Sequence, residues 1–212
     1  MGVASDIGAM RVVRPMSKRD RTSWMTVVVS FVNFTSFHAV REGYMACKST
    51  LHDRAKYPTV LLGEIDFGFC ASYACGLFTA GYLGREYGVR KTIAISFLLT
   101  GLLSIAFGAV IGYALAPKSE DEAWTVAWTA HVPLWMASAF VQGWTYPNFI
   151  ALLSDSIEPY FRATVLTVWA TASPVGDIVG LQIAQAVLRE GEEHWPYVMF
   201  VAGVFVLLNL VL

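Results

Sequence analysis

Six runs of apolar residues, each about 20 residues long, constrain this chain more than any other feature of its sequence. A helix needs about 20 residues to cross a hydrocarbon layer about 30 Å thick, because each residue advances it by about 1.5 Å. The composition agrees, since 56% of the 212 residues are hydrophobic and only 15% are charged. The sequence therefore predicts an all-α membrane protein with six transmembrane helices, at about Ser23–Met45, Val60–Leu83, Thr92–Leu115, Ala127–Leu153, Ala163–Leu188 and Trp195–Leu212.

The same composition excludes several other classes of protein. A net charge of −1 and a largely apolar chain argue against nucleic-acid binding. Cys47, Cys70 and Cys75 lie in or beside apolar runs without the spacing of metal ligands, so we interpret them as small apolar side chains. Neither a disulfide scaffold nor a metal site is predicted, and no cofactor is implied.

The chain divides into a basic leader, residues 1–22, and a transmembrane bundle, residues 23–212. The leader contains five Lys and Arg residues but no apolar stretch, which is not the pattern of a cleaved secretory signal. Six spans place both termini on one side, which has nine Lys and Arg residues against five on the other. The positive-inside rule then places the termini in the cytoplasm or the matrix. The organelle stays open between the mitochondrial inner membrane and the endoplasmic reticulum.

The ends of the spans carry two further signals. Tryptophans fall there, as expected for rings that sit at the interface between lipid and water: Trp24, Trp124, Trp128 and Trp195. The sixth span is short, and the sequence stops at Leu212 without a polar flank. We therefore expect half of a larger assembly, and whether Leu212 is the natural terminus stays open.

Arg41 is the ionisable residue inside a span that most strongly suggests function. A charge at the centre of a bilayer costs at least about 2.5–3.5 kcal/mol unless it meets a partner or water. Phe34, His38, Arg41, Met45 and Lys48 follow helical spacing and share one face of the first span. Since a guanidinium binds two phosphate oxygens at once, this face is suited to an anion. The alternative is that the Arg41 side chain simply reaches the far interface, at the opposite end of the span from Ser23.

Other polar residues in the spans have plainer interpretations. Glu64 and Asp66 lie near the start of the second helix, where a carboxylate favours the helix dipole and could pair with Arg41 or Lys48. Pro147 and Pro174 are expected to kink their helices. No motif pairs a nucleophile with a base, so no catalytic residues are predicted and an enzyme is not expected.

Several short motifs point to one family. In chain order they are Phe37 to Arg41 with Lys48, Leu62-Gly63 with Asp66, Ser72-Tyr73-Ala74 with Gly76, the loop residues Gly81, Gly84, Arg85, Gly88 and Arg90, Gln142 with Pro147, and Arg162, Trp169, Gly176 and Gly180. Together they resemble the organophosphate:phosphate antiporters of the major facilitator superfamily, in particular the sugar-phosphate exchangers related to glycerol-3-phosphate transporters. The resemblance runs from about Phe31 to the end of the chain and covers only the amino-terminal half of that fold. It implies two inverted three-helix repeats, with substrate bound at the midplane between two halves.

The resemblance also implies site residues. Arg41 matches the arginine that holds the substrate phosphate, with Tyr73, His38 and Lys48 beside it. The cavity lining expected around them is Phe34, Gln142, Trp169 and Ser173. The chain departs from the family at several positions: Glu42 replaces a usual lysine, Leu77 and Ser173 replace a lysine and a histidine of bacterial relatives, and Arg85-Glu86 reverses the usual order of the loop signature.

Two functional hypotheses follow. In the first, the chain is a half transporter for organophosphate and inorganic phosphate, surrounded by membrane lipid and completed by a second copy or a separate six-helix half. In the second, the bundle no longer transports and serves as an accessory subunit among other membrane subunits, plausibly in a respiratory complex of the mitochondrial inner membrane.

Overall fold

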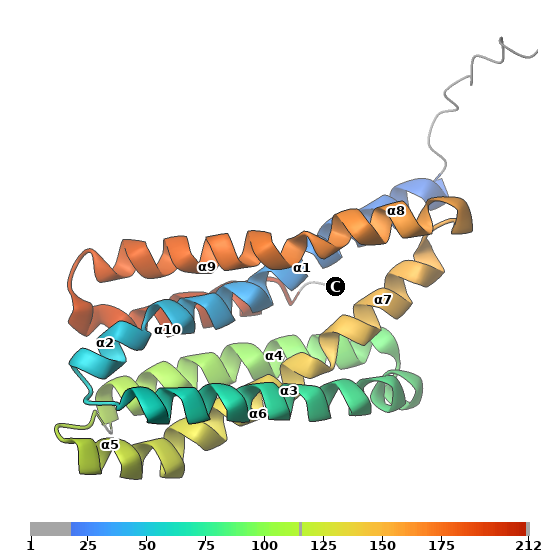
Figure 1. Cartoon of the computed structure of the whole chain (residues 1–212). Helices are drawn as coiled ribbons and strands as arrows, with labels where there is room; N and C mark the ends of the chain where they lie inside the picture. Colours follow the sequence, from blue (N-terminus) through green and yellow to red (C-terminus); the bar gives the residue numbers. More distant parts are fainter. Residues whose placement is uncertain (1–17, 115, 211–212) are drawn as a thin grey trace, which may run out of the picture.

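The computed structural model describes residues 18–114 and 116–210, and within these residues every regular element is a helix (Figure 1). The α-helices are α1 Lys18–Ala46, α2 Lys48–Asp53, α3 Thr59–Tyr87, α4 Val89–Ala109, α5 Glu120–Val126, α6 Val132–Gly143, α7 Thr145–Ser156, α8 Pro159–Ala170, α9 Ala172–Leu188 and α10 Trp195–Leu208. Two π-helical segments, η1 Val110–Ala114 and η2 Ala127–His131, and one 3₁₀ turn, η3 Glu192–His194, complete the list.

The six predicted spans are confirmed as helical segments, although their boundaries shift. The spans are α1 with α2, α3, α4 with η1, the segment from α5 to α7, α8 with α9, and α10. Within the described part of the chain, four stretches are long and apolar enough to cross a membrane: Ser23–Asp53, Thr59–Glu86, Val89–Gly112 and Pro159–Leu188. The fourth span is divided into shorter helices, and α10 has only 14 residues. Helix α1 begins at Lys18, inside the predicted leader, whose residues 1–17 lie outside the described part of the chain.

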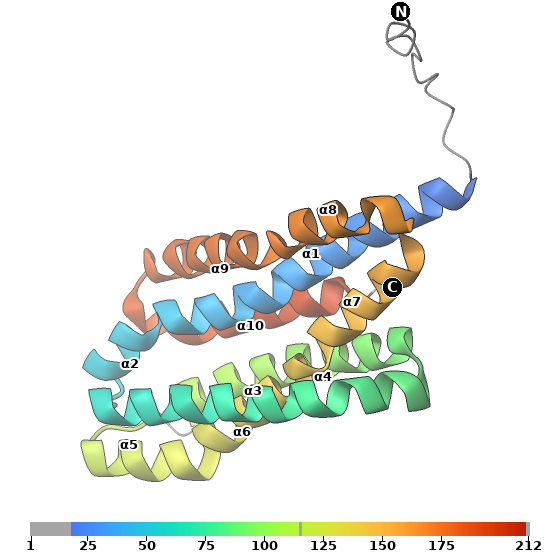
Figure 2. The same ribbon diagram turned by 45° about the vertical axis from the view of Figure 1, so that its right-hand side comes forward.

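The spans form two layers that agree between two views (Figures 1 and 2). One layer contains α1, α8, α9 and α10, and the other contains α3, α4, α5 and α6, while α7 crosses from the second layer towards the first. The most extensive pairings are α1 with α9, α3 with α6, and α4 with α10. If spans one, two and three are exchanged with spans four, five and six, the pairing of spans one and five (α1 with α9) becomes the pairing of spans four and two (α6 with α3). The pairing of spans three and six (α4 with α10) stays the same. The packing therefore agrees with two equivalent three-helix units.

Glycines permit close approach in all three pairings. A Cβ atom on Gly180 of α9 would overlap the backbone of Ala39 in α1. On Gly143 of α6 it would lie 2.5 Å from the carbonyl oxygen of Tyr73, and on Gly203 of α10 it would lie 2.9 Å from a carbonyl oxygen of α4. Small residues let helix backbones come close enough for van der Waals packing, which holds helices together where no hydrophobic driving force acts between them.

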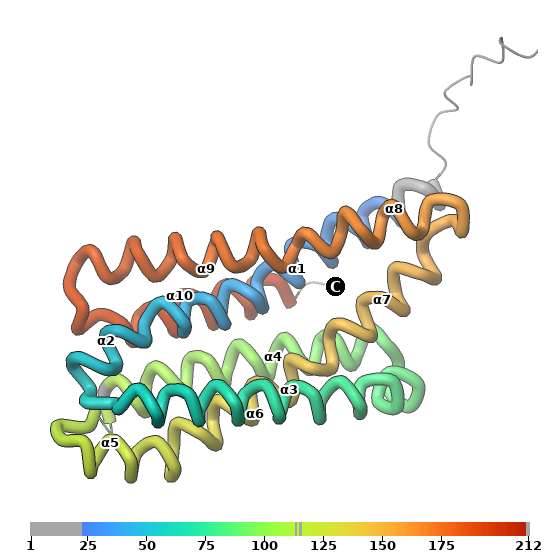
Figure 3. Tube along the Cα trace, viewed as in Figure 1, coloured from blue at the N-terminus to red at the C-terminus, as the bar shows by residue number. Residues whose placement is uncertain are grey.

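Both predicted proline kinks are confirmed as breaks in a helix (Figure 3). A proline has no N–H for the carbonyl four residues earlier and its ring crowds that carbonyl. Accordingly α6 ends at Gly143, four residues before Pro147, and α8 ends at Ala170, four residues before Pro174. The chain continues as α7 and α9 after one intervening residue, so the fourth and fifth spans each consist of successive helical segments.

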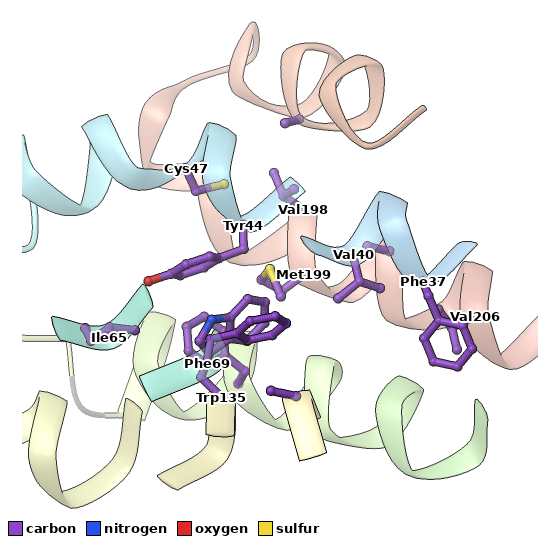
Figure 4. Packing of buried hydrophobic residues seen from close by; sticks show 14 of the residues in the cluster. Phe37, Val40, Tyr44, Cys47, Ile65, Phe69, Trp135, Val198, Met199 and Val206 are labelled. Atoms are coloured by element: carbon purple, nitrogen blue, oxygen red, sulfur yellow. The ribbon is translucent and has the colours of Figure 1, made fainter. Parts of the chain in front are cut away.

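An aromatic core lies between α1, α3, α6 and α10 (Figure 4). The ring of Trp135 lies 4.3 Å from that of Tyr44 and 5.0 Å from that of Phe69, between ring centroids. Trp195 also belongs to this core with 6% of its surface exposed, so its ring packs inside the bundle instead of contacting lipid as predicted. It lies at the buried N-terminus of α10, where it packs against Phe107.

Large apolar side chains cover the outside of the bundle. Phe67 and Phe78 of α3 are 76% and 89% exposed, as expected for side chains that face lipid rather than water.

We predict that Gly180→Val destabilises the bundle by about 1–3 kcal/mol, because its side chain must displace the backbone of α1. The matched control is Gly63→Val in α3, where a Cβ meets no other atom within 4 Å. Unfolding of the two purified variants in detergent, monitored by circular dichroism, measures the difference. Equal stability of both variants would contradict the role assigned to the α1–α9 contact.

Candidate functional site

A pocket of about 80 Å³ opens between the two layers, and five of the eight residues that line it were predicted from the sequence. Helix α1 contributes four side chains, α3 two, and α6 and α7 one each. The lining residues are Phe34, Phe37, His38, Arg41, Phe69, Tyr73, Gln142 and Thr145. The structure therefore brings together the predicted Arg41, Tyr73, His38, Phe34 and Gln142.

Arg41 presents its guanidinium to this pocket without a carboxylate partner. Its Cζ atom lies 5.7 Å from the ring centroid of Phe69, which is within the range of a cation–π contact. Three ion pairs occur among residues 18–114 and 116–210, and none of them includes Arg41. Its side chain is exposed rather than inserted into the core. The hydrogen-bonding fork of the guanidinium is thus available to an anion.

Tyr73 and Gln142 add polar groups to the same wall. The hydroxyl of Tyr73 forms no hydrogen bond with any described residue, and the ring stacks beside Phe69 with 6.4 Å between centroids. Gln142 is buried, and its Nε2 donates to Ser138 Oγ at 3.0 Å. Thr145, which sequence reasoning missed, donates its hydroxyl to the backbone oxygen of Gln142 at 2.6 Å.

His38 is held by two side chains of α9. Its Nδ1 atom lies 3.1 Å from Ser173 Oγ and 3.3 Å from Asp177 Oδ1. Ser173, expected in the lining, thus acts behind the pocket by contacting His38. Asp177 was not predicted as a site residue, although its spacing of four from Ser173 places the two on one helical face.

Trp169 supports the pocket from behind instead of lining it. Its ring stacks on Phe34 with 4.8 Å between centroids, and only 1% of its surface is exposed. Its Nε1 donates to Ser30 Oγ at 3.0 Å. The stack fixes the ring of Phe34, which in turn lies 4.9 Å from the His38 ring.

Lys48 is not among the lining residues of this pocket. Helix α1 ends at Ala46, and Cys47 forms a turn in which its N–H bonds to the carbonyl of Tyr44. The helical face predicted to continue to Lys48 is therefore interrupted. Lys48 forms an ion pair with Asp66 of α3, which was one of the predicted pairings, while Glu64 is exposed.

A second buried polar cluster surrounds that ion pair. The Lys48 ammonium lies 5.6 Å from the ring centroid of Tyr44, whose hydroxyl is 3.1 Å from Nε2 of His131. His131 is fully buried, and the ring of Tyr57 lies 5.4 Å from it. This cluster ties α1, α3 and η2 together at the end of the bundle that carries α2 and α5 (Figure 1).

The loop-signature residues lie at the opposite end of the bundle. Gly84 packs so closely on Asn148 of α7 that a Cβ would overlap its amide, whereas Gly81 faces open space. Gly88 joins α3 to α4 with φ of +89°, a conformation that glycine adopts readily. Arg85 and Arg90 are exposed, and no carboxylate of the described chain forms an ion pair with either.

Comparison with known proteins agrees with this architecture. The profile of the family described as Major Facilitator Superfamily matches residues 22–212. "Putative glycerol-3-phosphate transporter 2" of Arabidopsis thaliana is 29% identical over 177 residues, which cover 79% of this chain and 33% of that protein. "Sugar phosphate exchanger 3" of Homo sapiens is 26% identical over 164 residues, which cover 76% of this chain and 31% of that protein.

The chain spans about a third of the length of the curated relatives it matches. These relatives are named as transporters and exchangers and not as enzymes, and they give no support to the accessory-subunit hypothesis. No solved structure gives a significant match. The apolar helices and the family match together identify an integral membrane protein.

We predict that Lys48→Gln and Asp66→Asn each lower stability by about 1–3 kcal/mol, because each leaves a partly buried charge without its partner. The double variant should lose less than the sum of the two single losses, since the pair is then removed as a unit. Thermal unfolding in detergent of the wild type, the two single variants and the double variant gives the four stabilities of this double-mutant cycle. Strictly additive losses would show that the two side chains do not interact.

Proposed function

Because the chain belongs to the Major Facilitator Superfamily, we propose that it forms the phosphate-binding half of an exchanger of organophosphates and inorganic phosphate. The observation that carries this proposal is the Arg41 guanidinium, which faces a pocket and lacks a carboxylate partner among the described residues. Relatives named for glycerol 3-phosphate and sugar phosphate support a phosphate ester as the substrate class.

Each polar residue of the pocket has a role in this proposal. Arg41 binds two oxygens of the phosphate through its planar fork. The Tyr73 hydroxyl donates to a third oxygen, and His38, one turn from Arg41 on α1, contacts the anion beside it. Phe34, Phe37 and Phe69 exclude water from the pocket, which strengthens the attraction between opposite charges.

A second six-helix unit completes the site in this proposal, either as another copy or as a separate half. The pocket is small and the Arg41 side chain is exposed, so further surface can cover the substrate. Transport then proceeds by rocking one bundle against the other around the bound phosphate. The count of Lys and Arg residues supports termini on the cytoplasmic or matrix side.

We predict that the purified chain in mild detergent has the mass of at least two six-helix units after subtraction of bound detergent. Light scattering coupled to size-exclusion chromatography measures the mass, and mass spectrometry identifies any second polypeptide. A monomer would contradict the paired arrangement. Unrelated subunits of a large assembly would contradict the transporter proposal.

We predict that Arg41→Lys reduces phosphate binding at least about tenfold and abolishes exchange, because an ammonium retains the charge but cannot form the two-pronged contact. Binding of radiolabelled phosphate to the solubilised protein and exchange in reconstituted vesicles provide the two readouts. Arg189→Lys, at the exposed end of α9, is the matched control and should behave as wild type. Undiminished binding by the Arg41 variant would overturn the site assignment.

A further inference from the structure

The contact between His38 and Asp177 joins two residues that lie 139 positions apart in the chain. His38 belongs to α1 and lines the pocket, whereas Asp177 belongs to α9 and is 45% exposed at its side chain. Among the described residues, Asp177 forms an ion pair with His38 and with no other side chain. A carboxylate within a membrane-spanning segment is costly, so its pairing with a residue of the pocket requires explanation.

The contact with Asp177 favours one position for a proton on the His38 ring. An ionised carboxylate only accepts hydrogen bonds, so when Asp177 is ionised the Nδ1 of His38 carries a hydrogen and donates it to Asp177. Ser173 Oγ, at 3.1 Å from the same nitrogen, can share that hydrogen as a second acceptor. Nε2 is then the free nitrogen, and no described residue forms a hydrogen bond with it. As an uncharged ring it could only accept there, which is the wrong polarity for a phosphate oxygen.

The charges of the pocket indicate how this mismatch is resolved. With His38 neutral, Arg41 and Asp177 sum to zero, which gives little attraction for a dianion. A proton on Nε2 converts His38 into an imidazolium that donates to Asp177 through Nδ1 and to a phosphate oxygen through Nε2. The pocket then carries one net positive charge when the anion is present.

We propose that Asp177 positions and charges His38 so that phosphate enters the site together with one proton taken from solution. The step is balanced, because HPO₄²⁻ and H⁺ from water become the bound dianion and the Nε2–H of His38. This inference rests on the proposed function and deepens it, since it makes Asp177 a positioning residue and His38 the proton acceptor of the same site.

The other titratable groups around His38 do not duplicate this role. Arg41 lies one turn further along α1, followed by Glu42, which forms no ion pair within the described chain. Tyr73 of α3 shares the pocket, and Tyr146 of α7 contacts the Phe34 ring at 5.8 Å between centroids. Asp177 is the carboxylate within ion-pair distance of the His38 ring.

The test measures protons bound together with inorganic phosphate. Titration calorimetry in two buffers of different ionisation enthalpy gives this number at about pH 8, where free phosphate is mainly the dianion. The wild-type protein should take up about one proton more than His38→Gln, because linkage ties binding to the change in protonation. Asp177→Asn preserves an acceptor for Nδ1 but removes the charge, so it should lose at least about half of that uptake.

Asp155→Asn is the matched control, since Asp155 is an exposed carboxylate of α7 outside the pocket and should retain wild-type uptake. Nitrogen-15 spectra of the histidines, assigned with His38→Gln, should show a doubly protonated His38 ring in wild type with phosphate bound and a smaller fraction of that form in Asp177→Asn. A purely structural contact would leave proton uptake unchanged in the asparagine variant.

The outcomes separate this inference from the function on which it rests. Phosphate binding that needs Arg41 but has the same proton uptake in wild type and His38→Gln would overturn the inference alone. Absence of phosphate binding by the wild-type protein would overturn the proposed function and the inference together. Loss of the extra proton in both His38→Gln and Asp177→Asn supports both.

Discussion

The close approach of α1 to α9 is the constraint on which the rest of the structure depends. A Cβ atom on Gly176 would lie 2.5 Å from Cβ of His38, and one on Gly180 would overlap the backbone of Ala39. The same short separation brings Ser173 and Asp177 within hydrogen-bonding distance of His38. Because Gly176 and Gly180 have no side chains, α9 lies close enough to α1 for its polar residues to contact His38 beside the pocket.

The ionisable residues show how a bilayer protein limits the cost of its charges. Lys48 is neutralised by Asp66, and His38 contacts Asp177, so four polar groups of the spans form two pairs within the bundle. Arg41 differs because it is exposed on the side of the pocket and has no carboxylate partner in the described chain. Since an unpaired charge inside a membrane is expensive, such a residue is expected to face water or a ligand.

The breaks in the helices decide which side chains reach the pocket. Because Pro147 ends α6 at Gly143, the fourth span contributes Gln142 from one helix and Thr145 from the next. The turn at Cys47 has the opposite effect, since it ends the face of α1 that begins with Phe34 and directs Lys48 to Asp66. The sequence predicted Gln142 but not Thr145, and continuous helical periodicity was wrong in placing Lys48 on the pocket face with Arg41.

The sequence by itself determined the six spans, the two proline breaks and the face of α1 that carries Phe34, His38 and Arg41. These features follow from local causes, namely hydrophobic length, the missing N–H of proline and a period of 3.6 residues. Only the tertiary structure decided that Asp177 contacts His38, that Trp169 stands behind Phe34, and that Lys48 belongs to a different cluster. Those contacts depend on which helices pack together and on how closely their backbones approach, and neither quantity is set by residues that are neighbours in the chain.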